Sequence, residues 1–294
     1  MSSAVEYGSV VSRSHVLLFV LQRRRCSQYR MARMARSLPP RGAARTLGGK
    51  PCQEAISTVR VSFFFPAYND EGTVEPLATL ADEVLGDLVQ EHEILIVDDG
   101  SPDRSGEIAD RLAARNPRVR VVHHRQNRGY GQALWSGFQH SRYEWVAFTD
   151  GDMQYDVREL ASFVARAREG ADAVVGYKTH RAEGWRREVT SLVYNRVVRS
   201  LFGLRLRDVD CAFKLLRRDL LEGYRLSTDY TEAFLMVEVL YRGLRRGARI
   251  DELPVSHRLR PSGESQCFTW RTSRRLAWYA LRGAVVGRLL GAWA

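Results

Sequence analysis

The chain has 294 residues, of which 45% are hydrophobic and 27% are charged, a composition that fits a soluble globular protein with one large α/β domain. Its net charge of +11 would suit nucleic acid, but residues 1–57 hold ten of the 45 Lys and Arg residues and two of the 34 acids, which leaves a net charge of only +3 elsewhere and argues against that partner. The four cysteines form no CxxC pair that would suggest a zinc site or a disulfide framework, and no segment reaches the ~20 apolar residues of a membrane span, so we expect a cytoplasmic protein.

Residues 1–57 are the first expected segment. They are rich in Arg, Ser, Gly and Pro and lack sustained hydrophobic periodicity, which predicts a largely disordered basic tail. Tails of this charge more often contact phosphate-rich surfaces, lipid or nucleic acid, than take part in catalysis. Order is expected to begin at Thr58.

Strands and helices alternate after Thr58. Apolar runs predict strands, and apolar residues at helical spacing predict helices, in the order 59–65 (strand), 74–88 (helix), 94–97 (strand), 103–115 (helix), 119–122 (strand), 131–140 (helix), 145–148 (strand), 157–164 (helix) and 173–175 (strand). Pro66 is expected to end the first strand, and Ser101 or Asp103 to cap the second helix. This order predicts an α/β fold with a mostly parallel, Rossmann-like sheet flanked by helices.

The second half of the chain has a different character. It is expected to contain an amphipathic helix at 185–202, a polar segment and strand at 208–217, a helix at 230–245, an edge strand at 249–260 and a C-terminal amphipathic helix at 268–294. The apolar stripe of the first helix consists of Val189, Leu192, Val193, Val197 and Leu201. The two arginine-rich amphipathic helices could lie in the plane of lipid headgroups or pack against the domain.

Asp150, Gly151 and Asp152 directly follow the buried strand at 145–148. Ligands of parallel sheets bind at the carboxyl ends of the strands, and two adjacent carboxylates repel each other unless a cation lies between them. Mg²⁺ or Mn²⁺ takes carboxylate oxygens together with substrate phosphates, and Gln154 could add a neutral oxygen. The motif therefore favours a metal–diphosphate site over the alternative, a solvated turn.

Polar clusters also follow the first two strands. Pro66 and Tyr68, with Asp70 or Glu71, could clamp a nucleoside, or the segment could simply begin a helix. Asp98 or Asp99 could accept hydrogen bonds from a ribose or a base, as acids at strand ends do in nucleotide-binding folds, or could only form a turn.

Other segments give weaker evidence for a binding site. The glycine-bearing helix start at 127–131 could present backbone amides to an anion. Arg258, Arg260 and Ser265 could bind phosphate, although they and Lys214 could equally be solvated. The sequence has no strand–GxSxG–helix element, no P-loop and no GxGxxG after the first strand, which argues against a serine hydrolase, a P-loop enzyme and a dinucleotide oxidoreductase.

Taken in order, six motifs resemble those of the family 2 glycosyltransferases with the GT-A fold, most closely the dolichyl- and polyprenyl-phosphate sugar synthases. The motifs are FFFPAYNDE, IVDDGSPD, NRGYGQAL, FTDGDMQ, DVDCAFKLLRRD and ELPVSHRLRPSGES, and the resemblance covers residues 58–267. It implies an enzyme that transfers a sugar with inversion from a UDP- or GDP-sugar to a polyprenyl phosphate, with Mg²⁺ or Mn²⁺, at the membrane surface.

The resemblance also implies roles for the donor-side residues. Pro66, Tyr68, Asp70 and Asp98 would hold the base and ribose, with Asp99 nearby. The family usually has Glu after the Tyr-Asn pair, so either Asp70 or Glu71 would contact the base. Asp150, Asp152 and Gln154 match the metal-binding segment.

The acceptor side is matched by DVDCAFK and the later E-x-P and R-x-x-G-x-S pieces, with Cys211 and Ala212 departing from the family pattern. A lipid phosphate acceptor is already anionic, and Lys214 and Arg258 would orient it. A saccharide, protein or small-molecule hydroxyl acceptor would need a general base, for which Asp208 or Asp210 is the candidate. A non-catalytic protein that binds nucleotide sugars or membranes is the remaining alternative.

Overall fold

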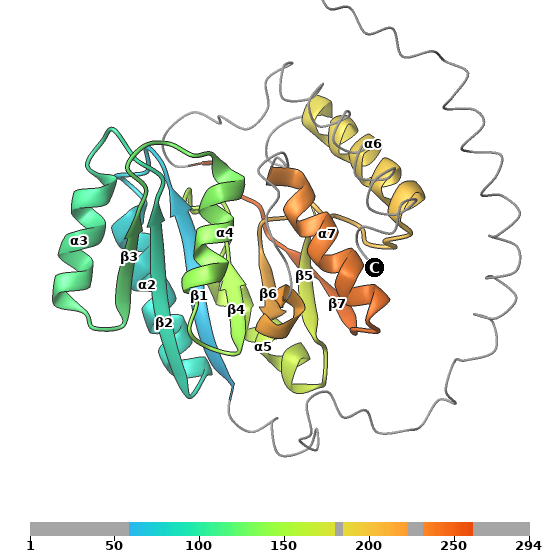
Figure 1. Cartoon of the computed structure of the whole chain (residues 1–294), viewed down its shortest axis with the longest axis horizontal. Coiled ribbons are helices and arrows are strands. Elements are labelled where there is room, and N and C mark those ends of the chain that lie inside the picture. The colour runs from blue at the N-terminus through green and yellow to red at the C-terminus, as the bar shows by residue number, and fades with distance from the viewer. Residues whose placement is uncertain (1–58, 180–184, 223–231, 261–294) are drawn as a thin grey trace, which may run out of the picture. The chain divides into compact units, whose positions relative to one another are not determined.

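The computed structural model describes residues 59–179, 185–222 and 232–260. The expected tail at 1–57 and the expected helix at 268–294 lie outside these ranges, as does Ser265. The described strands are β1 (Arg60–Ala67), β2 (Glu91–Asp98), β3 (Val119–His123), β4 (Trp145–Phe148), β5 (Ala173–Lys178), β6 (Lys214–Arg217) and β7 (Ile250–Val255). They form one sheet in the order β3-β2-β1-β4-β6-β5-β7 (Figure 1).

The predicted mostly parallel sheet is confirmed. β1 pairs in parallel with both β2 and β4, β2 with β3, and β5 with β7, whereas β6 runs antiparallel to β4 and β5. β7 lies at one edge of this sheet, as expected for that segment. Because β6 runs in the opposite direction, its first residue, Lys214, lies at the edge where the parallel strands end.

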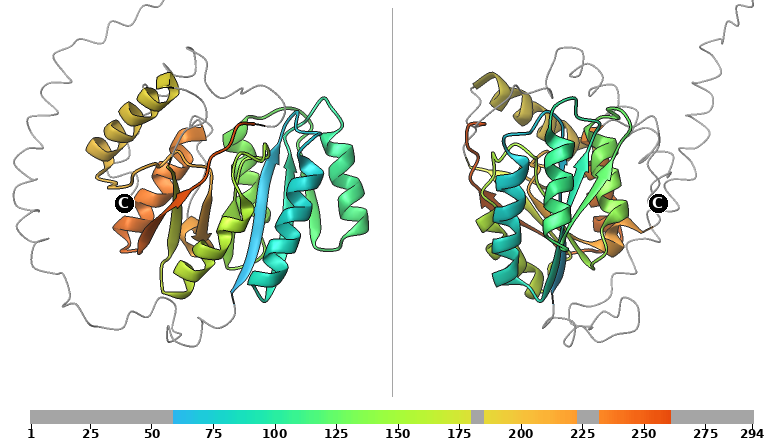
Figure 2. Two further views of the ribbon diagram at one scale, coloured as in Figure 1. Left: turned by 180° about the vertical axis from the view of Figure 1, so that it is seen from behind. Right: turned by 90° about the vertical axis from the view of Figure 1, so that its left-hand side faces the viewer.

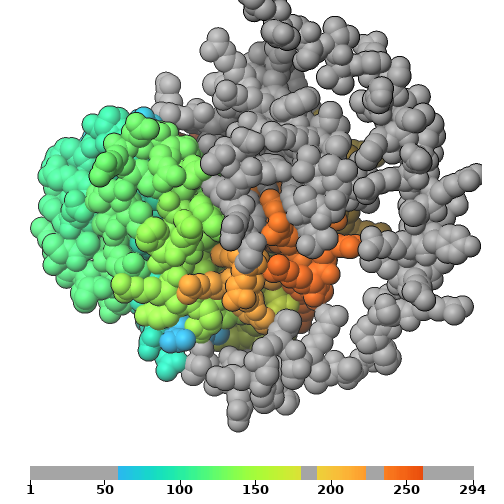
Figure 3. All heavy atoms as spheres, viewed as in Figure 1, coloured from blue at the N-terminus to red at the C-terminus, as the bar shows by residue number. Residues whose placement is uncertain are grey.

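Helices cover both faces of the sheet. The described helices are α2 (Val74–Leu88), α3 (Ser105–Arg115), α4 (Tyr130–His140), α5 (Leu160–Arg168), α6 (Trp185–Phe202) and α7 (Glu232–Arg245), with 3₁₀ turns η1 (Val157–Glu159) and η2 (Arg218–Leu221). One apolar core joins the sheet to α2, α3 and α5, and the other joins it to α4, α6 and α7 (Figure 2). Side chains of α4 and α7 form part of the surface in the space-filling view (Figure 3).

The alternation of side chains along β1 explains the two cores. Phe63 and Phe65 pack into the core with α2, and Phe64 packs into the core with α4. Successive residues of a strand point to opposite faces, so a strand between two helix layers must be apolar at nearly every position. This is why the run at 59–65 has no polar alternation.

The expected end of the first strand at Pro66 is wrong. β1 continues through Pro66 and Ala67, which pair with Val97 and Asp98 of β2. The pairing of β1 with β4 stops at Phe64, so the missing N–H of the proline removes no bond on that side. The second helix begins at Ser105 rather than 103.

The predicted apolar stripe of α6 is only partly buried. Leu192, Val193 and Val197 are 63%, 57% and 38% exposed. The buried positions of this helix include Tyr194 and Val198 instead. The pattern of apolar residues therefore predicted the helix correctly, and three of its stripe residues are exposed.

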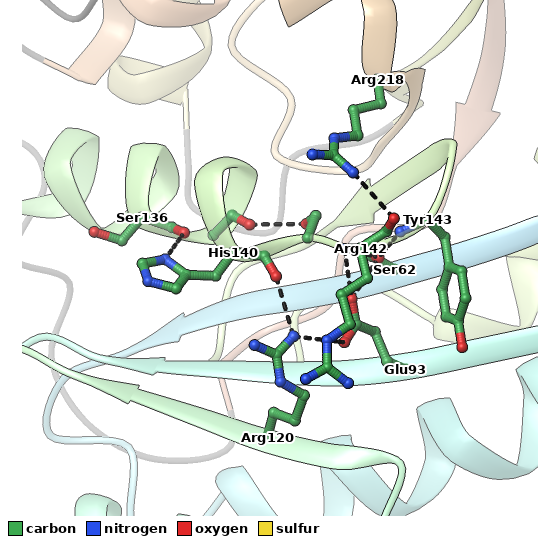
Figure 4. A network of polar contacts seen from close by, with 10 residues as sticks. Ser62, Glu93, Arg120, Ser136, His140, Arg142, Tyr143 and Arg218 are labelled. Atoms are coloured by element: carbon green, nitrogen blue, oxygen red, sulfur yellow. Dashed lines mark hydrogen bonds and ion pairs between the residues drawn. The ribbon is translucent and has the colours of Figure 1, made fainter.

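A buried carboxylate fixes the opposite edge of the sheet, where the parallel strands begin (Figure 4). Glu93 on β2 accepts hydrogen bonds from the hydroxyl of Ser62 (2.7 Å), the backbone N–H of Arg142 (2.7 Å) and the guanidinium of Arg120 (2.7 Å). The guanidinium of Arg218 donates to the carbonyl of Arg142 (3.0 Å). These bonds tie β1, β2, β3 and the loop before β4 together at this edge.

Candidate active site

One edge of the sheet collects the polar residues that follow its strands. β1, β2, β4 and β5 end at this edge, and the antiparallel β6 begins there. The register places Ala67 at the end of β1 beside Asp98 at the end of β2. The three acidic clusters expected from the sequence therefore lie along the same edge, as the carboxyl-end rule predicts.

The turn after β4 presents two carboxylates, each held by a donor from a different part of the chain. The hydroxyl of Tyr130, at the start of α4, donates to Asp150 Oδ1 (2.6 Å). A guanidinium nitrogen of Arg260 lies 2.7 Å from Asp152 Oδ2 and forms an ion pair with it. The backbone N–H of Gln154 donates to Asp152 Oδ1 (3.0 Å). Asp152 and Gln154 are buried.

The electrostatics of this pair are unfavourable without further positive charge. Burial, with the charge of Asp152, raises the pKa of Asp150 to about 6, although Tyr130, Lys178 and Arg260 oppose that shift. Burial also raises the pKa of Asp152, against the opposing effect of its bonds to Gln154 and Arg260. Among the described residues, the charged forms of these two carboxylates are thus disfavoured, and a bound cation would favour them.

Glycine is required between the two acids. A Cβ at Gly151 would clash with the carbonyl oxygen of Pro66 and would lie 3.2 Å from Asp70 Oδ2. The turn after β4 thus crosses the end of β1 in close contact. Asp70 accepts the backbone N–H of Tyr68 (3.0 Å), and burial raises the pKa of Asp70, with a smaller contribution from the charge of Asp150.

The structure separates the roles of the two acids after Tyr68. Asp70 lies beside the turn that carries Asp150. Glu71 is exposed and accepts the backbone N–H of Arg104 (3.2 Å), on the loop that begins α3. Asp70 is therefore the acid that the fold brings to the other carboxylates, and Glu71 joins two surface loops.

Asp98 remains at the edge with a partner on each oxygen. Its Oδ1 accepts the backbone N–H of Ser101 (2.9 Å), and its Oδ2 lies 2.8 Å from His123 Nδ1. The other ring nitrogen of His123 lies 2.9 Å from Asp110 of α3. Asp98 is thus held in one orientation at the end of β2, where it pairs with Ala67, the residue before the half-buried Tyr68.

Asp99 turns into the protein. It is 2% exposed, and its carboxylate accepts the backbone N–H groups of Arg128 and Gly129 (2.9 Å each). His124 Nδ1 lies 2.5 Å from Asp99 Oδ1. Both oxygens therefore hold the loop before α4. The sequence had offered Asp98 or Asp99 for contact with a ribose or a base, and of the two it is Asp99 that binds these backbone amides.

A second set of charges lies near the start of β6. Asp208 is 6% exposed, and its Oδ2 lies 3.5 Å from Lys178 Nζ at the end of β5. Glu252 of β7 accepts the backbone N–H of Arg207 (2.6 Å), which anchors the segment that carries Asp208. Asp210, two residues later, is half-buried. The structure thus places Asp208 in an ion pair with a lysine.

Lys214 lies inside the protein. It is 1% exposed, its Nζ donates to the carbonyl of Cys211, and the ammonium lies 5.5 Å from the centre of the Phe148 ring. Burial lowers the pKa of Lys214. The side chain therefore supports the start of β6, and the structure shows no direct bond from it to Asp150 or Asp152 among the described contacts.

Arg258 and Arg260 have different partners. The guanidinium of Arg258 contacts Asp156 (2.8 Å), whereas Arg260 contacts Asp152. The backbone of Arg258 exchanges hydrogen bonds with Gln154, whose side chain donates to the Arg258 carbonyl (2.9 Å) and whose carbonyl accepts the Arg258 N–H (2.8 Å). Gln154 thus fastens the segment after β7 to the acidic turn.

Residues 62–225, more than half of the chain, match the model of the family described as "Glycosyl transferase family 2". The chain belongs to glycosyl transferase family 2. The order of acidic clusters along one sheet edge, described above, agrees with this membership.

Three curated relatives illustrate the family. Glycosyltransferase AglD of Haloferax volcanii is 34% identical over 74% of this chain and 36% of its own length. The undecaprenyl-phosphate 4-deoxy-4-formamido-L-arabinose transferase of Shewanella sediminis is 30% identical over 70% of this chain and 61% of its own length. The polyprenol monophosphomannose synthase of Mycolicibacterium smegmatis is 31% identical over 71% of this chain and 81% of its own length. The chain thus spans 36% and 61% of the first two relatives.

A solved structure shares the fold. Glucosyl-3-phosphoglycerate synthase from Mycobacterium tuberculosis, crystallised with Mn²⁺, UDP and phosphoglyceric acid, superposes with a TM-score of 0.59 at 22% identity, over 79% of this chain and 80% of that chain. The fold is therefore the GT-A type expected from the motifs. No helix within the described ranges is long and apolar enough to cross a membrane.

The acidic edge of this family 2 chain suits a hard divalent cation. In the described part of the chain, no group of three or more His, Cys, Asp or Glu side chains is arranged to hold a metal ion by itself. Mg²⁺ commonly takes only one or two protein carboxylates and completes its shell with substrate phosphates and water. The half-buried Asp150 and the buried Asp152, whose pKa values are both raised, are the residues that fit such an ion.

Three residues of the edge were not among the sequence-based site assignments. Tyr130 and Lys178 had no role there, and Arg260 was weighed for phosphate binding but not retained. Lys178 could have been found by applying the carboxyl-end rule to the fifth strand, which it ends. The contact of Tyr130 with Asp150 joins residues 20 apart, and the sequence carries no signal for it.

Proposed function

We propose that this chain is an inverting, metal-dependent glycosyltransferase that moves a sugar from a nucleoside diphosphate sugar to a polyprenyl phosphate. The observation that carries the proposal is the pair of carboxylates on Asp150 and Asp152 at the carboxyl edge of the sheet, one held by the hydroxyl of Tyr130 and the other by the guanidinium of Arg260. Such a pair is unfavourable in a purely structural turn and useful for a metal-bound diphosphate.

The relatives support the lipid acceptor. One is named as an undecaprenyl-phosphate transferase and another as a polyprenol monophosphomannose synthase. We therefore assign the same class of acceptor to this chain.

The donor would bind across the ends of β1, β2 and β4. Asp98 and the half-buried Tyr68 would contact the nucleoside. Asp70, which accepts the backbone N–H of Tyr68 and lies close to Gly151, would link them to the acidic turn. Asp150 and Asp152 would hold Mg²⁺ or Mn²⁺. When bound, that ion would supply positive charge to the departing diphosphate.

Basic side chains of the protein would complete the site. Arg260 and Lys178 are the positive groups that act on Asp150, and this supports a role for both in binding an anionic ligand at this edge. A lipid phosphate is already anionic near neutral pH, so its attack on the sugar needs no general base. In this proposal Lys178 and Arg260 orient phosphate groups. Lys214 keeps its buried structural position. Variants of Arg258 and Arg260 are compared in the Discussion.

A membrane surface is the proposed location of the acceptor. The exposed Leu192, Val193 and Val197 on α6 support this proposal, because exposed apolar side chains next to arginines suit the boundary between headgroups and acyl chains. Arg196 lies on the same exposed side of the helix. We propose that the protein binds the cytoplasmic face of the membrane through this surface.

The test is a donor and acceptor screen with the full chain. UDP- and GDP-sugars are incubated with Mn²⁺ or Mg²⁺, with and without a short polyprenyl phosphate, and release of nucleoside diphosphate is measured. We expect lipid-dependent release that EDTA stops and that Asp152→Asn lowers by at least ~100-fold. Asp87→Asn, an exposed substitution on α2, is the matched control. Full activity of Asp152→Asn, or of the wild type in EDTA, would overturn the proposal.

A further inference from the structure

The loop between β3 and α4 is seated on a single buried carboxylate. Asp99 accepts the backbone N–H of Arg128 on Oδ1 and that of Gly129 on Oδ2, both at 2.9 Å. Gly100, next to Asp99, has a φ of +70°, and a Cβ there would lie 2.7 Å from the backbone nitrogen of Asn127. The turn after β2 and the start of α4 are therefore in direct backbone contact.

A buried histidine holds this carboxylate from behind. His124 is 8% exposed, and its Nδ1 lies 2.5 Å from Asp99 Oδ1. Its Nε2 lies 2.8 Å from the hydroxyl of Ser136 on α4. Hydrogen bonds on both sides of a buried ring leave it one orientation, so Asp99 is fixed relative to α4.

Tyr130 comes directly after the loop residues that Asp99 binds. It is the first residue of α4, and the preceding Gly129 has a φ of +88°, a conformation that favours glycine. Its hydroxyl donates to Asp150 Oδ1 at 2.6 Å. The position of that hydroxyl therefore depends on the two amide bonds that Asp99 makes one and two residues earlier.

We propose that Tyr130 is a positioning residue for Asp150, and that Asp99 acts through Tyr130 rather than on the donor. This inference rests on the proposed function, because it concerns the metal-bound donor. Asp150 and Asp152 repel each other, so an unrestrained Asp150 side chain would rotate away from its neighbour. The hydroxyl of Tyr130 holds one oxygen and leaves the other available to a ligand. The bonds from Asp99 to the loop before Tyr130 thus link the end of β2, where the nucleoside would bind, to the turn that carries Asp150.

The first test compares Tyr130→Phe with the wild type. Mn²⁺ binding is measured from the loss of the free Mn²⁺ electron paramagnetic resonance signal, with Mn²⁺ alone and with added UDP or GDP. We expect Tyr130→Phe to bind Mn²⁺ about 10- to 100-fold more weakly, the usual effect of removing a partner of a metal ligand. Nucleotide affinity in EDTA should stay within about twofold of wild type, and added Mn²⁺ should restore transfer activity.

Tyr143→Phe is the matched control. Tyr143 lies at the opposite edge of the sheet (Figure 4), where the Arg60 guanidinium lies 5.5 Å from its ring centre. The substitution removes a tyrosine hydroxyl without touching the acidic edge, so Mn²⁺ affinity should not change. Equal Mn²⁺ affinity in Tyr130→Phe and Tyr143→Phe would overturn the inference.

The second test asks whether Asp99 acts through Tyr130. Asp99→Asn should also weaken Mn²⁺ binding, and adding Tyr130→Phe to it should cost less than about twofold more, because residues in one hydrogen-bonded chain are not additive. If Asp99→Asn does not fold, Ser136→Ala replaces it in the same double-mutant comparison. That substitution removes only the hydroxyl that contacts His124. Additive effects would exclude action through Tyr130. Absence of Mn²⁺ binding by the wild type would instead overturn the proposed function, and this inference with it.

Discussion

The guanidinium of Arg260 lies 2.7 Å from the carboxylate of Asp152, although the two residues are 108 positions apart. This ion pair joins the segment after β7 to the turn after β4. Two hydrogen bonds between Gln154 and the backbone of Arg258 hold the same two segments together. The positive charge nearest the acidic pair therefore comes from the far end of the described chain.

Arg260 and Arg258 form a natural pair of variants. We expect Arg260→Gln to lower kcat/KM for the donor by about 100-fold, because it removes a charged donor beside the departing diphosphate. Arg258→Gln should lower it less than about threefold, since this exposed guanidinium pairs with Asp156 and exposed ion pairs contribute little. Steady-state kinetics with a fixed acceptor measure both. The opposite order would return Arg258 to the role that the sequence assigned to it.

The raised pKa of Asp150 predicts a pH dependence of stability in the metal-free protein. The folded pKa of about 6 exceeds the ordinary value of 3.8, so the folded state binds more protons than the unfolded state between these values. Stability from this group is complete below pH 4 and is lost as the pH rises through 6. Relative to Asp150→Asn, the wild type should lose unfolding free energy across this range.

Urea unfolding in EDTA, at several pH values from 4 to 7.5, measures this difference. Adding Mn²⁺ at pH 7.5 should stabilise the wild type and not Asp150→Asn, because only the folded wild type gains a ligand. Parallel stability curves for the two proteins in EDTA would contradict the electrostatic account of the site.

The exposed apolar residues of α6 predict membrane binding. Leu192→Glu should reduce co-sedimentation with vesicles that contain anionic phospholipid by at least ~10-fold, because one leucine contributes about 1.5–3 kcal/mol when buried. Leu244→Glu is the control, since Leu244 is a leucine on α7 that is 44% exposed. Equal losses in both variants would point to nonspecific adsorption, and no loss in Leu192→Glu would remove α6 from the membrane surface.

Asp208 distinguishes the two classes of acceptor. If the acceptor is a lipid phosphate, Asp208→Asn should retain activity within about tenfold, because an anionic nucleophile needs no general base. Its effect would then arise from the lost ion pair with Lys178. If the acceptor is a hydroxyl, loss of the base should cost about 10²–10⁴-fold. Asp210→Asn, measured in parallel, reports on the second candidate, and the comparison uses turnover at saturating donor.

Local sequence patterns were sufficient to predict the order of the described strands and helices and the acidic residues at the carboxyl edge of the sheet. The apolar run at 59–65, between two helical periodicities, predicts a strand covered on both faces, and β1 is such a strand. The expectation at Pro66 failed because a proline's effect depends on where the neighbouring strand stops pairing, and β4 stops pairing at Phe64. The stripe on α6 left two alternatives open, since periodicity finds an apolar side but not what covers it, and Leu192, Val193 and Val197 are exposed.

The sequence by itself determined the α/β order and the candidates Asp70, Asp98, Asp150 and Asp152, because parallel strands bring their carboxyl ends to one edge. Only the tertiary structure decided which acids serve that edge and which serve the interior. Asp99 turns inward to backbone amides and Glu71 turns outward to a surface loop, although each adjoins a residue at the edge. The physical reason is that a carboxylate's role depends on which donors reach it, and Tyr130, Arg260 and Lys178 arrive from distant segments that no local pattern connects.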